Sequence, residues 1–195
     1  MNAEKMLGAA LDAHMEAAEK LRALAEPFGA MARDVTERLR AGGRLLIFGN
    51  GGSAADAQHL ATELVARFEI ADRPAIGAVA LTCDTSALTA ICNDWCVERM
   101  FARQVEALGR PGDVALGIST SGNSGNVTEA LLTARGIGML RIGFTGRDGG
   151  RMAALLDHEM RVDSAVTARI QEMHILLGHA LCGCIEQSLF DASPA

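Results

Sequence analysis

The fold is decided by Leu45-Leu-Ile-Phe-Gly-Asn-Gly-Gly-Ser53, a short apolar run that ends in a glycine-rich turn. An uninterrupted apolar run of this length predicts a strand that is buried on both faces, and residues 53–67 after the turn have the pattern of a helix. A buried strand that passes through glycines into a helix begins a βαβ unit. The stretch therefore predicts a parallel sheet.

The same alternation of strand and helix recurs to the end of the chain. Further apolar runs predict strands at residues 76–81, 114–118, 139–144 and 158–162. Helices are expected to begin at Asp84 and Ser124, the latter ending at Gly136, and to cover residues 152–156 and 165–189. No linker or repeat divides this pattern. We predict one doubly wound α/β domain of about five parallel strands over residues 1–195, with residues 42–190 as its α/β core.

Residues 1–41 precede the first strand, and we expect them to form a helical extension. Over residues 3–25, apolar side chains recur every three or four positions, and alanine dominates the face that they form. Small side chains let backbones approach closely, which suits packing against another helix or a second subunit. Pro27 and Gly29 are expected to end this helix, and a second helical run reaches Arg40.

The composition excludes several classes of reaction. The only lysines are Lys5 and Lys20, both in the N-terminal extension, and tyrosine is absent. A P-loop needs a lysine after its glycine-rich turn, pyridoxal phosphate chemistry needs a buried lysine amine, and a Tyr/Lys hydride-transfer site needs both residue types. An anion must therefore be bound by arginine, hydroxyl groups, backbone N–H groups or a metal.

Charge and hydropathy indicate the environment and the partners. The net charge of -6, without a basic run, argues against nucleic acid as a partner. The N-terminus carries charges throughout and lacks the apolar segment of a signal peptide, and no window reaches about 18 apolar residues. Five cysteines without C-x-x-C spacing predict buried free thiols in a reducing compartment. We expect a cytoplasmic protein without a membrane or nucleic-acid partner.

Two loops that follow predicted strands have an unusual composition. The first, residues 49–53, is Gly-Asn-Gly-Gly-Ser, and the second, residues 119–124, is Ser-Thr-Ser-Gly-Asn-Ser. Glycine permits close approach of the backbone, hydroxyl groups donate hydrogen bonds, and the following helix offers unpaired N–H groups and the positive end of its dipole. Together the loops predict a phosphate site built without lysine.

A dinucleotide site is the competing interpretation, because Gly49, Gly51 and Ala54 match the spacing of a nicotinamide-binding fingerprint. In that fold an acidic residue ends the second strand of the unit. Here Glu69 and Asp72 precede the strand expected near residue 76, and a dinucleotide leaves the hydroxyl-rich second loop without a role. The sequence therefore favours the phosphate site.

Candidate catalytic or metal-binding side chains lie on two predicted helices. His59 and Glu63 are four residues apart, so they share one face of the first helix. On the last helix, Gln171 lies about 80° from His179 and about 60° from His174, so helix geometry does not choose between the two histidines. This set is either a metal site, an acid/base pair, or a group of hydrogen-bonded core residues.

Four motifs carry a resemblance over nearly the whole chain. They are Gly49-Asn-Gly-Gly-Ser-Ala-Ala-Asp-Ala-Gln-His59, Gly117-Ile-Ser-Thr-Ser-Gly-Asn-Ser124, Phe144-Thr-Gly-Arg-Asp-Gly-Gly150 and Arg169-Ile-Gln-Glu-Met-His174. In this order they resemble the phosphoheptose isomerases, a branch of the sugar isomerase (SIS) domain proteins. The resemblance implies a cytoplasmic homotetramer with one zinc ion per site. It also implies conversion of D-sedoheptulose 7-phosphate into D-glycero-D-manno-heptose 7-phosphate, the first step of heptose supply for the lipopolysaccharide core.

The resemblance implies roles for individual residues as well. The phosphate falls to Ser53 and to loop 119–124, while Asn93 and Asp94, which by themselves are equally typical of a turn, contact the substrate. The implied zinc ligands are His59, Glu63, Gln171 and His179, which selects His179 over His174. The implied substrate contacts are Asn50, Gly51, Gly52, Ser53, Glu63, Asn93, Asp94, Ser119, Thr120, Ser121, Ser124 and Gln171.

The implied reaction needs an acid and a base. An aldose–ketose interconversion moves a proton between C1 and C2, and the economical route is an enediolate. We expect Glu63 to act as the base at carbon and His179 as the acid at oxygen. A metal held by the same side chains would polarise the carbonyl or hold the site in shape, and these roles conflict because a carboxylate tied to zinc is a poorer base.

A relative without known isomerase activity is the alternative. Residues 168–174 and Ser188-Leu-Phe190 are also similar to the DnaA initiator-associating protein, a SIS tetramer that binds a replication initiator. That branch lacks the acid/base pair, which this chain keeps as Glu63 and His179, so the resemblance favours catalysis. Some relatives have an acidic residue at the position of Ala168. This chain therefore has no acid there that could take part in the reaction.

Overall fold

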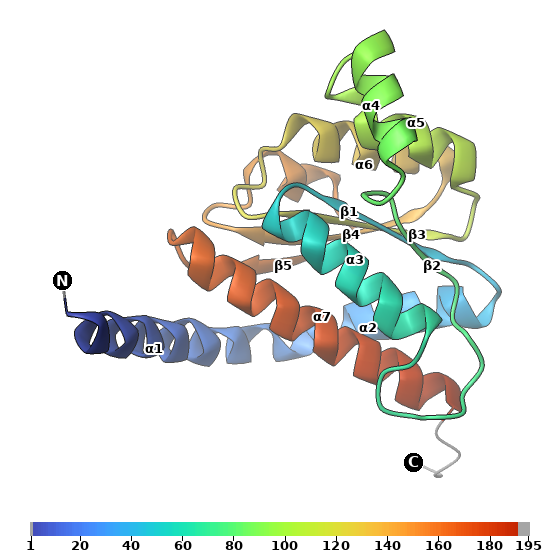
Figure 1. The fold of residues 1–195 in the computed structure, drawn as a ribbon. Helices are drawn as coiled ribbons and strands as arrows, with labels where there is room; N and C mark the ends of the chain where they lie inside the picture. Colours follow the sequence, from blue (N-terminus) through green and yellow to red (C-terminus); the bar gives the residue numbers. More distant parts are fainter. Residues whose placement is uncertain (1, 191–195) are drawn as a thin grey trace.

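The computed structural model describes residues 2–190 and contains a five-stranded parallel sheet (Figure 1). The strand order is β2-β1-β3-β4-β5. This order is doubly wound, as the alternation of strands and helices predicted. The strands are β1 (Leu45–Gly49), β2 (Ala78–Ala80), β3 (Val114–Ser119), β4 (Leu140–Gly146) and β5 (His158–Val162).

Helices cover both faces of the sheet and separate two hydrophobic cores (Figure 1). Leu45 and Ile47 of β1 point into one core, and Leu46 and Phe48 point into the other, because side chains alternate along a strand. The first core lies under α2 (Ala25–Arg40), α3 (Gly52–Val65) and α7 (Thr167–Phe190). The second lies under α5 (Arg99–Leu108), α6 (Gly125–Ile137) and the 3-10 helix η2 (Gly150–Leu155), with α4 (Thr85–Asp94) packed on α5.

The N-terminal extension is helical, but its first helix ends earlier than predicted. Helix α1 (Ala3–Lys20) gives way to the 3-10 turn η1 (Leu21–Leu24), and α2 already begins at Ala25. Pro27 lies in the first turn of α2, where its missing N–H has no helical partner to lose. The prediction that Pro27 ends the first helix is therefore wrong.

Two further elements differ from the prediction. Strand β2 covers only residues 78–80 of the predicted 76–81. Helix α5 was not predicted, although Phe101, Ala102 and Val105 are buried on one side of it and charged side chains lie on the other. Their spacing of one and four residues is the helical signal that the sequence offered.

Helix α1 projects from the body of the molecule (Figure 1) and exposes large apolar side chains. These are Met6, Leu7, Leu11 and Met15. It contacts η1 and, from the middle of the helix at Ala10 and His14, also α7. Within residues 2–190, no helix, α1 included, is long and apolar enough to cross a membrane.

The cysteines are free but not uniformly buried. Cys182 is buried, and burial raises the pKa of its thiol to about 12. Cys83 and Cys96 are exposed, so the expectation of buried thiols is wrong at these two positions. Cys83 lies between β2 and α4, and Cys96 lies just after α4.

Candidate active site

The two predicted phosphate loops lie next to each other at the carboxyl edge of the sheet. Strands β1 and β3 pair directly, with Gly49 opposite Ile118. The chain leaves β1 into α3 on one face and β3 into α6 on the other, so the sheet order reverses between the two loops. In open parallel sheets this reversal point is the ligand crevice.

A pair of asparagines ties the two loops together. The side-chain amides of Asn50 and Asn126 exchange two hydrogen bonds of 2.8 Å, one in each direction. Asn126 is only 6% exposed and was not predicted as part of the site. The available signal was a polar residue in the first turn of α6 at a position that faces the sheet.

Both helices that leave the crevice begin without a capping side chain. The N-cap of α3 is Gly51, and at the N-cap of α6 the Ser124 hydroxyl instead pairs with the Ser119 hydroxyl at 3.0 Å. The Ser53 and Ala54 N–H groups of α3 donate to backbone carbonyl oxygens of residues 50 and 51, and the Val127 N–H of α6 donates to the Asn126 side chain. The earlier N–H groups, those of Gly52, Gly125 and Asn126, make none of these bonds, and with the serine and threonine hydroxyls they form an arrangement suited to an anion.

The loop 119–124 is held in place by a close approach that only glycine permits. Gly122 has a positive φ of 63°, and a Cβ atom there would overlap the carbonyl oxygen of Gly149. Thr120 and Ser121 are half-buried at the rim of the crevice. Ser53, by contrast, is 3% exposed and packs against Gly49, so in this chain its side chain is turned inward.

Gln171 reaches the first loop from α7. A Cβ atom on Gly52 would collide with the Gln171 amide, so the amide lies directly against the loop backbone. The structure thus brings Gln171 to the first of the two phosphate loops.

Asn93 and Asp94 lie apart from the loops in this chain. Both are exposed at the end of α4, where the Asn93 amide donates to the Asp94 carboxylate at 2.9 Å. No hydrogen bond among residues 2–190 joins either of them to residues 49–53 or 119–124. The structure therefore does not bring them into the crevice.

The candidate acid/base residues meet where α3 packs on α7. The Nε2 atoms of His59 and His179 lie 2.7 Å apart, and His59 Nε2 is 3.4 Å from Glu63 Oε1. The helices approach closely because Gly178 has no side chain, and a Cβ atom there would collide with Leu60. The His59 side chain is 46% exposed and the Glu63 side chain 21%, so a substrate can reach both.

The structure separates the two histidines between which helix geometry did not choose. His174 is fully buried, and one ring nitrogen lies 2.9 Å from the carbonyl oxygen of Thr145. Burial lowers the pKa of His174 to about 4, so its ring is neutral at physiological pH. His174 is a core residue, whereas His179 lies beside His59 and Glu63.

The donor atoms at the helix crossing have the chemistry of a zinc site but not yet its geometry. Zinc binds imidazole nitrogen and carboxylate oxygen at about 2.0–2.2 Å, and two nitrogens on one tetrahedral ion lie about 3.3 Å apart. The His59–His179 contact of 2.7 Å is shorter, so the rings would have to separate. Gln171 lies eight residues before His179, about 12 Å along the helix, and contacts Gly52 instead. Within residues 2–190, no group of three or more His, Cys, Asp or Glu side chains is arranged to hold a metal ion.

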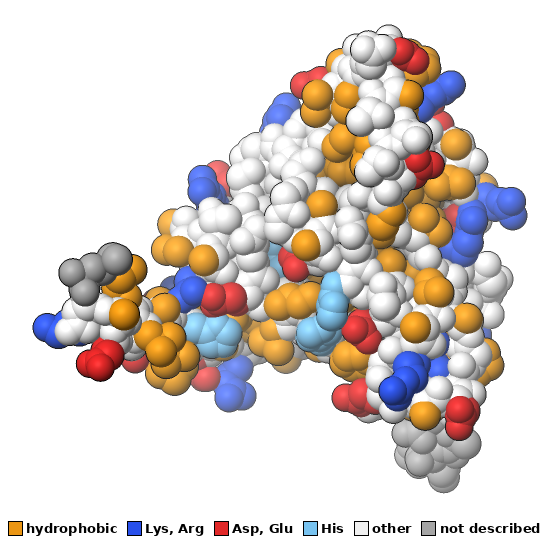
Figure 2. Space-filling view, viewed as in Figure 1, with side chains coloured by type: hydrophobic (Ala, Val, Ile, Leu, Met, Phe, Trp, Pro, Cys, Tyr) orange, Lys and Arg blue, Asp and Glu red, His pale blue; other side chains and the backbone are white. Residues whose placement is uncertain are grey.

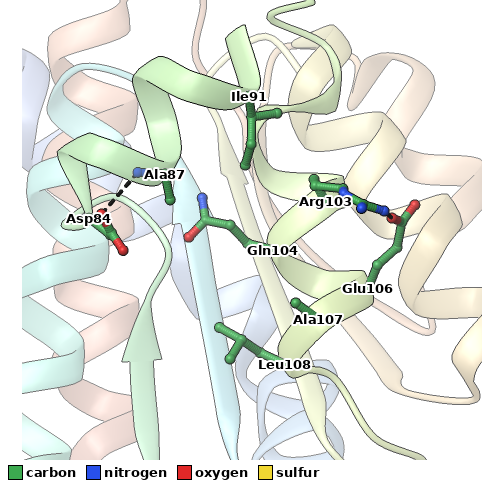
Figure 3. Close-up of a pocket in the computed structure, with 8 residues that line it drawn as sticks. All are labelled: Asp84, Ala87, Ile91, Arg103, Gln104, Glu106, Ala107 and Leu108. Carbon is green, nitrogen blue, oxygen red and sulfur yellow. Dashed lines mark hydrogen bonds and ion pairs between the residues drawn. The ribbon is translucent and has the colours of Figure 1, made fainter. Parts of the chain in front are cut away.

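A separate pocket of about 410 Å³ lies between α4 and α5 (Figure 3). Asp84 lines it and caps α4 through a hydrogen bond to the Ala87 N–H. Arg103 and Glu106 form an ion pair of 2.8 Å at its rim. None of the predicted site residues lines this pocket, so the candidate active site remains at the crevice and the α3–α7 crossing.

Comparison with known sequences finds similarity to a family with sugar-related chemistry. The family model of the SIS domain matches residues 10–146. The phosphoheptose isomerase of Paramagnetospirillum magneticum is 59% identical over 164 residues, which cover 84% of this chain and 85% of that protein. The phosphoheptose isomerase of Trichlorobacter lovleyi is 51% identical over 181 residues, 92% of each chain.

Solved structures agree with the sequence comparison. A phosphoheptose isomerase from Neisseria gonorrhoeae superposes with a TM-score of 0.90 at 46% identity, covering 95% of this chain and all of that one. A phosphoheptose isomerase from Francisella tularensis superposes with a TM-score of 0.92 at 36% identity, covering 96% of this chain and all of that one.

Proposed function

The chain belongs to the SIS domain family and, within it, to the phosphoheptose isomerases, and we propose that it converts D-sedoheptulose 7-phosphate into D-glycero-D-manno-heptose 7-phosphate. One observation carries the proposal beyond family membership. The first anion-binding loop opens α3, and the same helix carries His59 and Glu63, which meet His179 of α7, at a separation that matches the substrate.

The distance from the first loop to His59 is close to the length of the extended substrate. His59 lies seven residues after Gly52, about 10 Å along α3 at 1.5 Å per residue. An extended seven-carbon sugar with a terminal phosphate has about eight bonds from phosphorus to C1 and spans about 10 Å, at about 1.2 Å of advance per bond in a zigzag chain. A phosphate at the N-termini of α3 and α6 therefore puts C1 and C2 beside His59, Glu63 and His179.

The two ends of the site divide the work. The phosphate is held by Thr120, Ser121 and the N–H groups of Gly52, Gly125 and Asn126, and Gln171 orients the chain of hydroxyl groups beside Gly52. The Glu63 carboxylate takes the proton from carbon, and the His179 ring gives a proton to the carbonyl oxygen that becomes the enediolate hydroxyl. Glu63 then returns its proton to the neighbouring carbon, C2, and the His179 ring takes the proton of the C1 hydroxyl, whose oxygen becomes the aldehyde oxygen, so both groups end in their starting state.

The isomerase assay tests this proposal. Purified full-length protein, supplied with zinc, is expected to convert D-sedoheptulose 7-phosphate into the aldose, detected by a chemical assay or chromatography of the two sugars. The same reaction run with chelator measures how much activity depends on metal. Unchanged ketose, together with binding of a replication initiator protein, would overturn the proposal in favour of an initiator-binding role.

Zinc is the proposed cofactor, with His59, Glu63 and His179 as donors once the two rings separate, and Gln171 as the fourth predicted ligand. When bound, the ion would polarise the substrate carbonyl or fix the donors in place. We predict about one zinc ion per chain after dialysis and its loss in His179→Gln, measured by elemental analysis. The matched control is His158→Gln, because His158 pairs with Asp34 on the far edge of the sheet and should leave the metal in place. A metal-free protein with full activity would contradict the prediction.

Membership of the same family also supports proposals for the oligomeric state and for the cellular role of the protein. The apolar side chains along α1 are exposed in the single chain, and many of them are seen in Figure 2. Burying this face against further copies is the support for a homotetramer. A cytoplasmic role in heptose supply for the lipopolysaccharide core completes the proposal.

A further inference from the structure

A buried ion pair outside the proposed reaction lies directly behind the acid/base residues. The side chains of Arg73 and Glu186 are 0% and 1% exposed, and the Arg73 Nε–H donates to a Glu186 carboxylate oxygen. The same carboxylate accepts hydrogen bonds from three consecutive backbone N–H groups, those of Phe68 at 3.0 Å, Glu69 at 2.7 Å and Ile70 at 2.8 Å. We call the Glu186 carboxylate and these four donors the Glu186 clamp.

The clamp fixes the segment after α3 onto the last turns of α7. Burial by itself raises the pKa of Glu186, but the hydrogen bonds from Arg73 and from the backbone outweigh it and hold the pKa at about 2. The carboxylate is therefore charged at neutral pH, and each hydrogen bond to it is charge-assisted. Residues 68–70 are bound to α7 more firmly than an ordinary surface loop.

Arg73, one of the four donors of the Glu186 clamp, also contacts the backbone of Glu63. The Arg73 Nη2 donates to the backbone carbonyl oxygen of Glu63 at 2.6 Å, in the last turn of α3. Its Nη1 donates to the carbonyl oxygen of Pro74 at 2.8 Å, so the guanidinium has little freedom to move. The backbone that carries the Glu63 carboxylate is thus tied through Arg73 to Glu186.

Phe68, another donor of the Glu186 clamp, contacts His179 through its ring. The Phe68 ring stacks on the His179 ring, with centroids 5.7 Å apart and planes at 24°. On its other side His179 meets the edge of His59, with centroids 5.0 Å apart and planes at 63°. Because the Phe68 N–H is held by Glu186, the clamp decides where the Phe68 ring lies and therefore which positions the His179 ring can take.

We propose that the Glu186 clamp is a positioning device for the acid/base pair, with Arg73 fixing the backbone of Glu63 and Phe68 fixing the ring of His179. The inference rests on the proposed isomerase function and assigns Phe68, Arg73 and Glu186 to it as positioning residues. None of the three needs to touch the substrate. Their effect is on the geometry of proton transfer, which is sensitive to displacements of about 1 Å.

Phe68→Leu is the decisive variant, because it keeps an apolar side chain and removes the ring. We expect kcat for D-sedoheptulose 7-phosphate to fall about 10- to 100-fold while KM changes less than about twofold, since the phosphate loops are untouched. Phe68→Tyr keeps the stacked ring and is expected to restore kcat to within about threefold of the unmodified protein. Phe101→Leu, in the core on the opposite face of the sheet, is the matched control for the loss of an aromatic ring.

A second readout does not depend on activity. The ring-proton NMR signal of His179 is expected to shift in Phe68→Leu and in Glu186→Gln, because both move or remove the ring that stacks on it, and to stay in place in Phe101→Leu. An unchanged kcat in folded Phe68→Leu, or an equal loss in Phe101→Leu, would overturn the inference while leaving the isomerase function standing. An inactive unmodified protein would overturn the proposed function, and an unmoved His179 signal would then reject the clamp independently.

Discussion

We expect Glu63→Gln to abolish turnover of D-sedoheptulose 7-phosphate while the protein still folds and still binds the sugar phosphate. The amide has the size of the carboxylate, and the backbone carbonyl oxygen of residue 63 can still accept from Arg73, so α3 keeps its place. What is lost is the base, whose contribution to proton transfer is about 10²- to 10⁴-fold in rate. Steady-state kinetics and calorimetric titration with the substrate measure the two properties separately.

The control for this variant is Glu129→Gln, the same chemical change on α6. Glu129 pairs with Arg99 at 3.6 Å on the surface and has no contact with the helix crossing of α3 and α7. It should retain kcat and KM. If Glu63→Gln kept more than about a tenth of kcat, a loss far below that expected for general-base catalysis, Glu63 would lose the role of base.

We expect Glu186→Ala to lower the free energy of unfolding by about 3–5 kcal/mol, the range found when one partner of a buried ion pair is removed. This loss of stability comes from the buried groups that remain without their partner. The Arg73 guanidinium remains buried without its anion, and the N–H groups of residues 68–70 lose their common acceptor. Urea unfolding at pH 7, followed by circular dichroism, measures the change.

The matched control is Glu106→Ala. Glu106 also pairs with arginines, Arg99 and Arg103, but its side chain is 32% exposed. Water replaces its lost hydrogen bonds, so the cost should not exceed about 1 kcal/mol. Equal losses in the two variants would show that the burial of the Glu186 clamp adds nothing.

The same pair predicts how stability depends on pH. The pKa of Glu186 falls from its ordinary 4.5 to about 2 on folding, so the unfolded chain takes up a proton at a higher pH than the folded one. The stability contributed by the ionised carboxylate is complete above about pH 5 and is lost as the pH falls toward 2. The stability difference between the unmodified protein and Glu186→Ala should therefore narrow over that interval.

Much of the fold was readable from local sequence. The apolar runs beginning at Leu45 and Val114 became the paired central strands β1 and β3, because a strand covered on both faces must be apolar on both. Asp84 caps α4 as its position suggested. Where a local signal was ambiguous, as at Pro27, the prediction failed because the same residue ends one helix or opens the next.

The candidate site was readable only in part. Gly122 and the serines around it indicated a loop at a strand end. Glycine and hydroxyl side chains are typical of such loops whichever distant residues pack against them. Asn126 and the Glu186 clamp gave no comparable signal. Each acts through partners far along the chain, Asn50 for the first and residues 68–73 for the second.

By itself the sequence determined the parallel sheet, the glycine- and hydroxyl-rich loops at its edge and the set of side chains able to do acid/base chemistry. Helix geometry left His174 and His179 open, the family resemblance pointed to His179, and the tertiary structure supplied the physical reason by placing His179, and not His174, against His59, 120 residues away. The period of a helix says which residues share a face but not which neighbour that face will meet. That choice is made by packing, here where the Leu60 side chain fills the space that Gly178 leaves open.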